Sequence, residues 1–476
     1  MTQPREIASP IAALFPAASE RERVEDRLTR ELIAACERVA AGSVTPTLDL
    51  AEFRCELAAF DFHEPRPLDE LLSWCIGQLE HGIVHLTHPR YFGLFNPAPT
   101  FPARCADRIA GAFNPQLATW TTSPVAVEIE RHVVRSVALR LGLPDDAGGH
   151  FTSGGSEANF TALLCALARA NPRYAIDGAR AFDGAPVFYT SRESHLAWLK
   201  VAHQAGIGRS AVRLVATDGK GCLNARELAD LIATDRASGR TPVMIVATAG
   251  TTNAGMIDPL DACADLAQVA GAWYHVDAAW GGALVASDAL RNRLAGIERA
   301  DSITLDAHKW FATTMGAGMF MTRHASLLST VFRVSTTFMP SELEQIDPYV
   351  TTAQWSRRFI GLRLFLSLAA AGWAGYRTHV ERAIAIAAEL RCELVARGWT
   401  VANDSPLAVL CVRPPARFGT PRSIVKRVLD SGRAWVAAAK LEEQDVIRIC
   451  VTHGEATGVD VRELANVLDR CGPAEA

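Results

Sequence analysis

The sequence predicts an α/β protein built on a mainly parallel, helix-covered sheet, followed by a separate small α+β domain. Strand-like and helix-like segments alternate over roughly two hundred residues, which is the pattern of a parallel sheet with right-handed crossovers. One predicted strand, Pro242 to Thr248, is apolar throughout, as expected of a strand covered on both faces. These two observations favour the α/β class.

The length and composition indicate a soluble globular protein of several parts. At 476 residues the chain is too long for one ordinary core, and we divide it into residues 1–87, 88–356 and 357–476. Hydrophobic residues make up 49% and charged residues 21%, and the net charge of -4 leaves no basic excess to neutralise nucleic acid. We therefore expect no nucleic-acid partner.

We expect a cytoplasmic protein without membrane association. Met1 to Glu6 lacks the basic stretch and apolar run of a signal peptide, and no later apolar run is long enough to span a bilayer. The 11 cysteines are scattered without paired spacing, which indicates neither a metal site nor a disulfide framework. We expect them to be reduced and mostly buried.

Residues 18–85 are predicted to form helices with charged faces and no core of their own. Such a segment is expected to pack on a partner surface or a second subunit. The aromatic stretch from His88 to Pro97 follows, and its glycine and prolines exclude a continuous helix, so it is a loop or an edge strand. A plug in the core and a pocket wall both explain it.

A glycine turn, Gly154-Gly155-Ser156, follows a helix predicted near residues 125–141 and opens an apolar helix over residues 160–170. The free backbone N–H groups at a helix start point toward one spot, so the turn is a candidate phosphate site. A tight turn capped by Ser156 is the alternative.

The alternating region comes next. Its predicted strands cover residues 185–190, 211–216, 242–248, 273–276, 302–305 and 318–322. Its predicted helices cover residues 194–204, 224–234 and 258–270. Glu227 is placed for a capping box in the second of these helices. The small domain is predicted from helices at 357–371, 379–397 and 423–430, strands at 407–412 and 446–451, and a terminal helix.

Chemically suggestive residues follow the strand ends. His195 comes after the first of the alternating strands, Thr251 after the third, Asp277 after the fourth, and His308 with Lys309 after the fifth. Ligands of parallel sheets bind beyond the carboxyl ends of the strands. We therefore expect these side chains to meet at one site.

Lys309 has apolar and aromatic neighbours on both sides. Burying an ammonium group there is costly because desolvation disfavours charge, which makes Lys309 a candidate amine nucleophile. From this stretch alone, a lysine that snorkels at a strand end explains the pattern equally well. The wider set is what pyridoxal 5′-phosphate requires: an anion cradle, a carboxylate such as Asp277 for the pyridine nitrogen, a stacking ring such as His195, and a lysine for the aldehyde.

The chain resembles the group II pyridoxal-phosphate-dependent amino acid decarboxylases, the family of glutamate, aromatic-amino-acid and diaminobutyrate decarboxylases. The most specific stretches are His275 to Gly282 (HVDAAWGG), Asp301 to Trp310 (DSITLDAHKW) and Thr152 to Asn159 (TSGGSEAN). The resemblance runs from about His88 to the C-terminus. It implies fold type I, with a mainly parallel seven-stranded sheet in the large domain and a small C-terminal α+β domain.

The resemblance also implies roles for single residues. Lys309 would form the Schiff base with pyridoxal 5′-phosphate, Asp277 would bind the pyridine nitrogen, and His195 would stack on the ring. The other cofactor positions lie along the phosphate and around the ring: Gly154, Gly155, Ser156, His308, Ala279 and Thr251. For Thr251 and His308, a place near the site without an essential role stays open.

The implied activity is decarboxylation of an L-amino acid to its amine and carbon dioxide through a quinonoid intermediate. A tyrosine on a mobile loop donates a proton in similar enzymes, and Tyr349, in a long loop predicted from Met339 to Ser356, lies at about the matching place. Another residue there would shift the reaction toward oxidative deamination to an aldehyde. Other fold-type-I reactions and a non-catalytic cofactor-binding scaffold are the remaining alternatives.

The resemblance implies that Phe95, Asn96 and Trp120 lie near the substrate. Leu94 replaces the polar residue expected of a glutamate decarboxylase and the aromatic residue expected of an aromatic decarboxylase, and Ala118 replaces a large aromatic residue. We therefore expect a small-molecule amino acid substrate outside both groups. Similar enzymes are dimers with sites at the subunit interface, which implies a homodimer.

Overall fold

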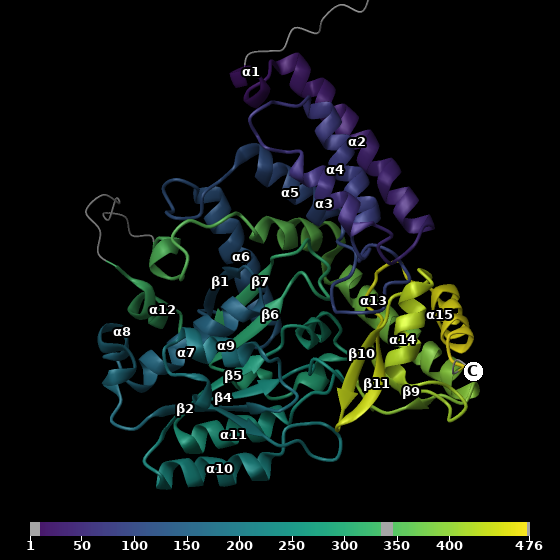
Figure 1. The fold of residues 1–476 in the computed structure, drawn as a ribbon. Coiled ribbons are helices and arrows are strands. Elements are labelled where there is room, and N and C mark those ends of the chain that lie inside the picture. The colour runs from purple at the N-terminus through teal and green to yellow at the C-terminus, as the bar shows by residue number, and fades with distance from the viewer. Residues whose placement is uncertain (1–9, 335–345, 474–476) are drawn as a thin grey trace, which may run out of the picture.

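The computed structural model describes residues 10–334 and 346–473. Residues 1–6, on which the expectation of no signal peptide rests, lie outside the described residues, as do residues 339–345 of the predicted loop. A central sheet covered by helices forms the body of the molecule, the N-terminal helices stand away from it, and the C-terminal segment packs at its side (Figure 1).

The central sheet has seven strands in the order β1-β7-β6-β5-β4-β2-β3. Only β7 is antiparallel to its neighbours, so the predicted mainly parallel sheet is confirmed. The strands are β1 (Gly148–Thr152), β2 (Pro186–Ser191), β3 (Val212–Val215), β4 (Thr241–Thr248), β5 (Trp273–Asp277), β6 (Ser302–Asp306) and β7 (Gly318–Thr322).

Helices cover both faces of this sheet, which is why β4 is buried along most of its length. Met244 and Val246 contribute to a core shared with α7, α9 and α12, whereas Ile245 and Ala247 contribute to the core of the other face with α6, α10, α11 and α13. The helices of this part are α5 (Phe101–Phe113), α6 (Pro124–Arg140), α7 (Gly155–Ala170), α8 (Tyr174–Asp177), α9 (Ala197–Gln204), α10 (Ala225–Ala237), α11 (Leu260–Ala270) and α12 (Ala325–Phe332).

Several local expectations were wrong. The stretch before the glycine turn forms strand β1, which the two glycines in GGHFT concealed. Asn224 caps α10 through its side chain, but Glu227 accepts a hydrogen bond from the Ala216 backbone N–H and does not close a capping box. By contrast, the stretch from His88 to Pro97 is a loop, one of the two predicted alternatives, with an isolated bridge from Tyr91 to Trp435.

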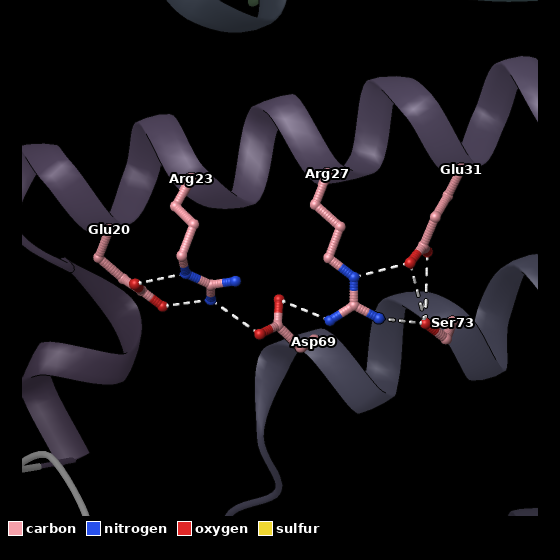
Figure 2. Close-up of polar contacts among 6 residues, drawn as sticks. All are labelled: Glu20, Arg23, Arg27, Glu31, Asp69 and Ser73. Carbon is pink, nitrogen blue, oxygen red and sulfur yellow. Dashed lines mark hydrogen bonds and ion pairs between the residues drawn. The ribbon is translucent and has the colours of Figure 1, made fainter.

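The N-terminal helices have almost no core, as predicted. They are α1 (Pro10–Leu14), α2 (Ala18–Ala41), α3 (Leu50–Ala58) and α4 (Leu68–Gly82). Ala35 is the only residue of α2, α3 and α4 that is buried. A charged ladder joins α2 to α4 instead: Arg23 and Arg27 both contact Asp69, at 2.7 and 3.1 Å (Figure 2). Such exposed pairs are screened by solvent and stabilise the helices only weakly.

The C-terminal segment consists of a long helix, two shorter helices and a four-stranded antiparallel sheet in the order β10-β11-β9-β8. The two helices expected at 357–371 and 379–397 form one element, α13, with a kink at Gly372, where φ is 63°. The elements are α13 (Gly361–Ala396), β8 (Thr400–Val401), β9 (Val409–Arg413), α14 (Pro421–Asp430), β10 (Ala437–Leu441), β11 (Gln444–Cys450) and α15 (Gly458–Arg470).

Two general expectations can be compared with the described residues. Within them, no helix combines the length and the apolar character needed to cross a bilayer. The cysteines are all free thiols. Fewer of them are buried than expected, namely Cys165, Cys263, Cys411 and Cys450.

Candidate active site

The carboxyl ends of β5 and β6 carry the acidic residues of the site. Asp277 ends β5 and Asp306 ends β6, and their side chains are almost completely buried. Lys309 follows one turn later, and its Nζ lies 3.0 Å from Asp306 Oδ2. The Lys309 side chain is 19% exposed, so the amine is accessible yet held against a carboxylate. A freely snorkelling lysine does not fit this arrangement.

Asp277 is held by two hydrogen bonds. Its Oδ2 accepts a hydrogen bond of 2.8 Å from Asn159 Nδ2, and its Oδ1 accepts one of 3.2 Å from the Ala279 backbone N–H. Asn159 belongs to α7, so this bond also ties the helix to the end of β5. A carboxylate with one donor on each oxygen keeps lone pairs available for a further donor, as a protonated ring nitrogen would be.

His195 lies in the turn between β2 and α9 and is exposed at the mouth of the site. Its Nδ1 accepts a hydrogen bond of 3.1 Å from the Ala197 backbone N–H, which fixes the ring. Partial desolvation lowers the pKa of His195, the charge of Asp277 opposes this shift, and Lys309 adds to it. The ring therefore senses both groups with which it was expected to share the cofactor.

The glycine turn lies beside the Lys309 segment. A methyl group at Gly155 would stand only 2.9 Å from Asp306 Oδ2, and one at Gly154 would stand 3.7 Å from His308 Cε1. Helix α7 begins at Gly155 after Gly154 as its N-cap, and no side chain caps it. Ser156 is therefore not the capping residue, and among the described residues the N–H groups of Gly155 and Ser156 have no acceptor and stay open to a ligand, whereas those of Glu157 and Ala158 donate to Gly154 O.

The residues at this point fit pyridoxal 5′-phosphate. An amine for the aldehyde, a carboxylate for the ring nitrogen, an imidazole and a helix start free of side chains converge from four elements of one sheet edge. The site also holds a negative charge beside the phosphate cradle, Asp306, whose Oδ1 has no hydrogen-bond partner among the described residues. Lys309 is the adjacent cation that offsets it.

Two predicted cofactor positions have local structural contacts of their own. His308 Nδ1 accepts a hydrogen bond of 3.2 Å from the Ala317 backbone N–H, and burial lowers the pKa of this histidine. Thr251 is fully buried, and its Oγ1 accepts a hydrogen bond from the Met256 backbone N–H in the loop after β4. For Thr251, this bond supports a role in shaping the loop.

An aromatic column forms the wall next to Lys309. Phe95 stacks on Trp280 at 4.3 Å between ring centroids, and Trp280 stacks on Trp310 at 4.7 Å. Lys309 Nζ lies 5.9 Å from the centroid of Phe95. The guanidinium of Arg448, from β11, lies 4.3 Å from the same ring. Phe95 therefore lies beside Lys309, and its contact with a substrate stays a prediction.

The structure does not bring the other predicted substrate and loop residues to Lys309. Asn96 Nδ2 donates to Met315 Sδ at 3.3 Å, and the Trp120 backbone N–H donates to Asp347 Oδ1 at 2.7 Å. Tyr349 stacks on Trp355 at 4.6 Å, and its backbone N–H donates to Ala118 O. The contacts of Trp120 and Tyr349 lie around the start of α6, whereas Asn96 contacts Met315.

Sequence reasoning missed four residues of the site. Asp306 and Asn159 both stand inside the recognised stretches. Asn159 lies four residues after Gly155, one helical turn along the same side of α7. Asp306 lies at the end of β6, three residues before Lys309. His275 lies two residues before Asp277 on the same strand face. Arg448 comes from the C-terminal sheet, and no local signal in the sequence connects it to Phe95.

Comparisons with known proteins agree with this geometry. Residues 57–412 match the pyridoxal-dependent decarboxylase conserved domain. An aromatic-L-amino-acid decarboxylase of Bacillus atrophaeus is 29% identical over 409 residues, covering 83% of each chain. An L-2,4-diaminobutyrate decarboxylase of Rhizobium meliloti (strain 1021) is 35% identical over 300 residues, covering 62% of this chain and 59% of that protein.

The same agreement holds for three-dimensional structures. The crystal structure of Oryza sativa TDC with PLP and tryptamine superimposes with a TM-score of 0.90 at 25% identity, covering 96% of this chain and 98% of that chain.

Proposed function

The chain belongs to the pyridoxal-dependent decarboxylase family and uses pyridoxal 5′-phosphate, and from this premise we propose that it converts an L-amino acid to its amine and carbon dioxide at Lys309. The observation that carries the proposal is the convergence of Lys309, Asp277 and His195 beside the open start of α7. No single one of these residues would support it alone.

When bound, pyridoxal 5′-phosphate withdraws electrons from the Cα of the amino acid, which makes loss of the carboxylate possible. The protein's own groups prepare this chemistry. Lys309 Nζ must lose a proton before it can act as a nucleophile, and Asp306 Oδ2, 3.0 Å away, is the nearest base. Asp277 would keep the ring nitrogen protonated, and His195 is the residue that would pack against the ring.

The remaining cofactor residues hold the phosphate end. Gly154 and Gly155 let the phosphate approach the first-turn N–H groups of α7, while Ser156 and His308 flank that turn. Ala279 follows β5 and, by the resemblance, would also lie against the ring. Its N–H is already used to hold Asp277.

The substrate side of the site supports an amino acid outside the glutamate and aromatic groups. Leu94 is 50% exposed and offers no polar partner, and the buried Ala118 presents only a methyl group where the resemblance leads us to expect a large aromatic side chain. Arg448 is almost completely buried with Nε and Nη2 lacking partners among the described residues, so its guanidinium is available to a substrate carboxylate. Asn96 and Trp120 complete the expected substrate contacts once the loop and a partner are in place.

The test of this proposal is a panel of L-amino acids, with 2,4-diaminobutyrate, glutamate and dihydroxyphenylalanine among them. Carbon dioxide release, amine formation and hydrogen peroxide are measured together. One amino acid outside the two excluded groups is expected to give equal amounts of amine and carbon dioxide. Efficient turnover of glutamate or dihydroxyphenylalanine would contradict the substrate assignment, and keto acid without carbon dioxide would contradict decarboxylation.

Tyr349 is the proposed proton donor to Cα. Its support is its place on the loop that ends at Trp355, together with the resemblance stated above. A Tyr349→Phe enzyme is expected to lose most amine formation and to release peroxide and aldehyde in its place. Unchanged amine production by the variant would remove Tyr349 from the mechanism.

The cytoplasmic homodimer is also a proposal. The N-terminal helices expose large apolar side chains that one chain does not cover: Ile11, Leu14, Phe15, Leu32, Ile33, Leu50, Leu57, Leu68 and Leu79. A second copy of the chain would bury them and would bring its own Tyr349 loop and Trp120 near the site. Light scattering is expected to give twice the mass of 51.3 kDa, whereas a monomer would refute it.

A further inference from the structure

We propose that Trp273, Ser302, His275 and Asn159 form a one-way hydrogen-bond relay that holds Asp277 as the acceptor for the cofactor's ring nitrogen. The inference rests on the proposed function, because Asp277 must face that nitrogen. The first four residues are positioning residues: they touch neither cofactor nor substrate and act through Asp277.

The relay is continuous and buried. Trp273 Nε1 donates to Ser302 Oγ at 2.8 Å, and Ser302 Oγ lies 2.8 Å from His275 Nδ1. His275 Nε2 lies 3.1 Å from Asn159 Oδ1, and Asn159 Nδ2 donates to Asp277 Oδ2 at 2.8 Å. All five side chains belong to residues that are at most 5% exposed.

The two ends together fix the direction of every step, because an indole N–H can only donate and a carboxylate can only accept. Ser302 Oγ accepts from Trp273 and keeps its own hydrogen for His275 Nδ1, while Asp277 requires the Asn159 amide N–H. The proton of neutral His275 then sits on Nε2 and is donated to Asn159 Oδ1, which leaves the Asn159 amide N–H for Asp277. The opposite tautomer would turn Asn159 Oδ1 toward Asp277 Oδ2, placing two acceptors in contact.

The surroundings of His275 keep it neutral, as the relay requires. Burial lowers the pKa of His275 to about 4, although the charge of Asp277 and a hydrogen bond to the Ser302 backbone both act in the other direction. Trp198 packs edge-on against the ring, with centroids 5.6 Å apart. A doubly protonated imidazole would donate to Ser302 as well and would leave the Ser302 hydroxyl hydrogen without its acceptor.

The relay also connects the two ends of the cofactor site. His275 and Asp277 point to the same side of β5, and Ser302 is the β6 residue paired with His275. Asn159 lies one turn after Gly155 on α7, the helix whose start forms the phosphate cradle. One bond from Asn159 thus sets the distance between the carboxylate and the cradle.

The direct test compares two ligands on the apoprotein: pyridoxal 5′-phosphate and its 1-deaza analogue, which lacks the ring nitrogen. Asn159→Leu removes the hydrogen-bond donor to the charged Asp277. It is therefore expected to weaken the binding of pyridoxal 5′-phosphate by about 10- to 100-fold and the binding of the deaza analogue by less than about threefold. Thr161→Val is the matched control, because Thr161 is fully buried on the same helix and bonds only Glu157 O. It is expected to change neither affinity.

Ser302→Ala provides a variant further from the cofactor. It should weaken the binding of pyridoxal 5′-phosphate more than the binding of the deaza analogue, but by a smaller factor than Asn159→Leu does. Ser302→Thr should restore the affinity. Equal losses for both ligands, or no loss in either relay variant, would overturn the relay. Failure of the unaltered protein to bind pyridoxal 5′-phosphate would instead refute the cofactor site on which the relay rests.

A spectroscopic measurement tests the direction without any ligand. The ¹⁵N spectrum of the histidine-labelled apoprotein, with His275 assigned from the signal lost in His275→Gln, is expected to show a neutral ring protonated at Nε2. A ring protonated at Nδ1 would contradict the direction of the relay, whatever the affinities.

Discussion

The buried ion pair beneath the glycine turn gives the clearest energetic prediction. Arg357 Nη2 lies 2.7 Å from Glu130 Oε1, with side chains only 3% and 6% exposed. Arg357 Nη1 also donates to Phe151 O at 3.1 Å, and Phe151 is on β1, immediately before the turn that holds the phosphate. The pair therefore joins α6, β1 and the segment that enters α13.

Replacing Arg357 by Met leaves Glu130 buried without its partner. Breaking a buried pair in this way costs about 3 to 5 kcal/mol of unfolding free energy. The adjacent Arg358 is a matched control, because its contact with Asp107 is 3.5 Å long and its side chain is 58% exposed. Arg358→Met should cost less than about 1 kcal/mol.

Urea unfolding of the apoprotein, followed by tryptophan fluorescence, measures both variants. With an m-value of about 3 kcal/mol/M, Arg357→Met is expected to lower the midpoint by about 1 M or more. The double variant Glu130→Leu, Arg357→Met should recover much of the loss, since apolar pairs often replace buried ion pairs without penalty. Equal, small losses for Arg357→Met and Arg358→Met would refute the reasoning.

Three further predictions concern the site and its surroundings. His195→Ala should weaken cofactor binding by about three- to tenfold through lost ring stacking, and His195→Phe should not, as measured by fluorescence titration. Gly155→Val should weaken inorganic phosphate and cofactor binding at least about tenfold by displacing the neighbouring carboxylate, whereas Gly77→Ala, with open space around it, should leave binding unchanged. Because His275 has a folded-state pKa of about 4 against 6.5 unfolded, the unfolded chain binds the extra proton between these values. This group should therefore lower the unfolding free energy by about 1.4 kcal/mol per pH unit as pH drops from 6.5 to 4. Urea unfolding at a series of pH values should show a shallower slope of unfolding free energy against pH in His275→Gln. The raised pKa of Asp258, about 7, acts in the opposite direction but equally in both proteins.

Much of the fold could be predicted because its signals are local. Apolar runs such as Pro242 to Thr248 mark buried strands, and the residues that follow them reach one edge by topology alone. The sequence alone therefore predicted that Lys309, Asp277 and His195 lie at one edge of the sheet. Strand β1 escaped because its glycines read as a turn, and α13 was divided because the helical pattern weakens around Gly372.

The parts of the site that could not be predicted depend on contacts between distant segments. The hydrogen bond from Asn159 to Asp277 spans 118 residues, and the contact of Arg448 with Phe95 joins β11 of the C-terminal sheet to the loop before α5. Neither contact produces a hydrophobic periodicity or a local motif in the sequence. Tyr349 is the opposite case. The resemblance suggested its role from its place in a loop, and in this chain Tyr349 packs on Trp355 rather than near Lys309. Its role stays a prediction.

The central claim, that Lys309 carries the cofactor, is tested by reducing the holoenzyme with borohydride and locating the adduct by peptide mass spectrometry. The chain has five lysines, Lys200, Lys220, Lys309, Lys426 and Lys440, so the assignment is unambiguous. The pyridoxyl group is expected on Lys309 and absent from Lys309→Ala. An adduct on another lysine, or none on the unaltered protein, would contradict the account.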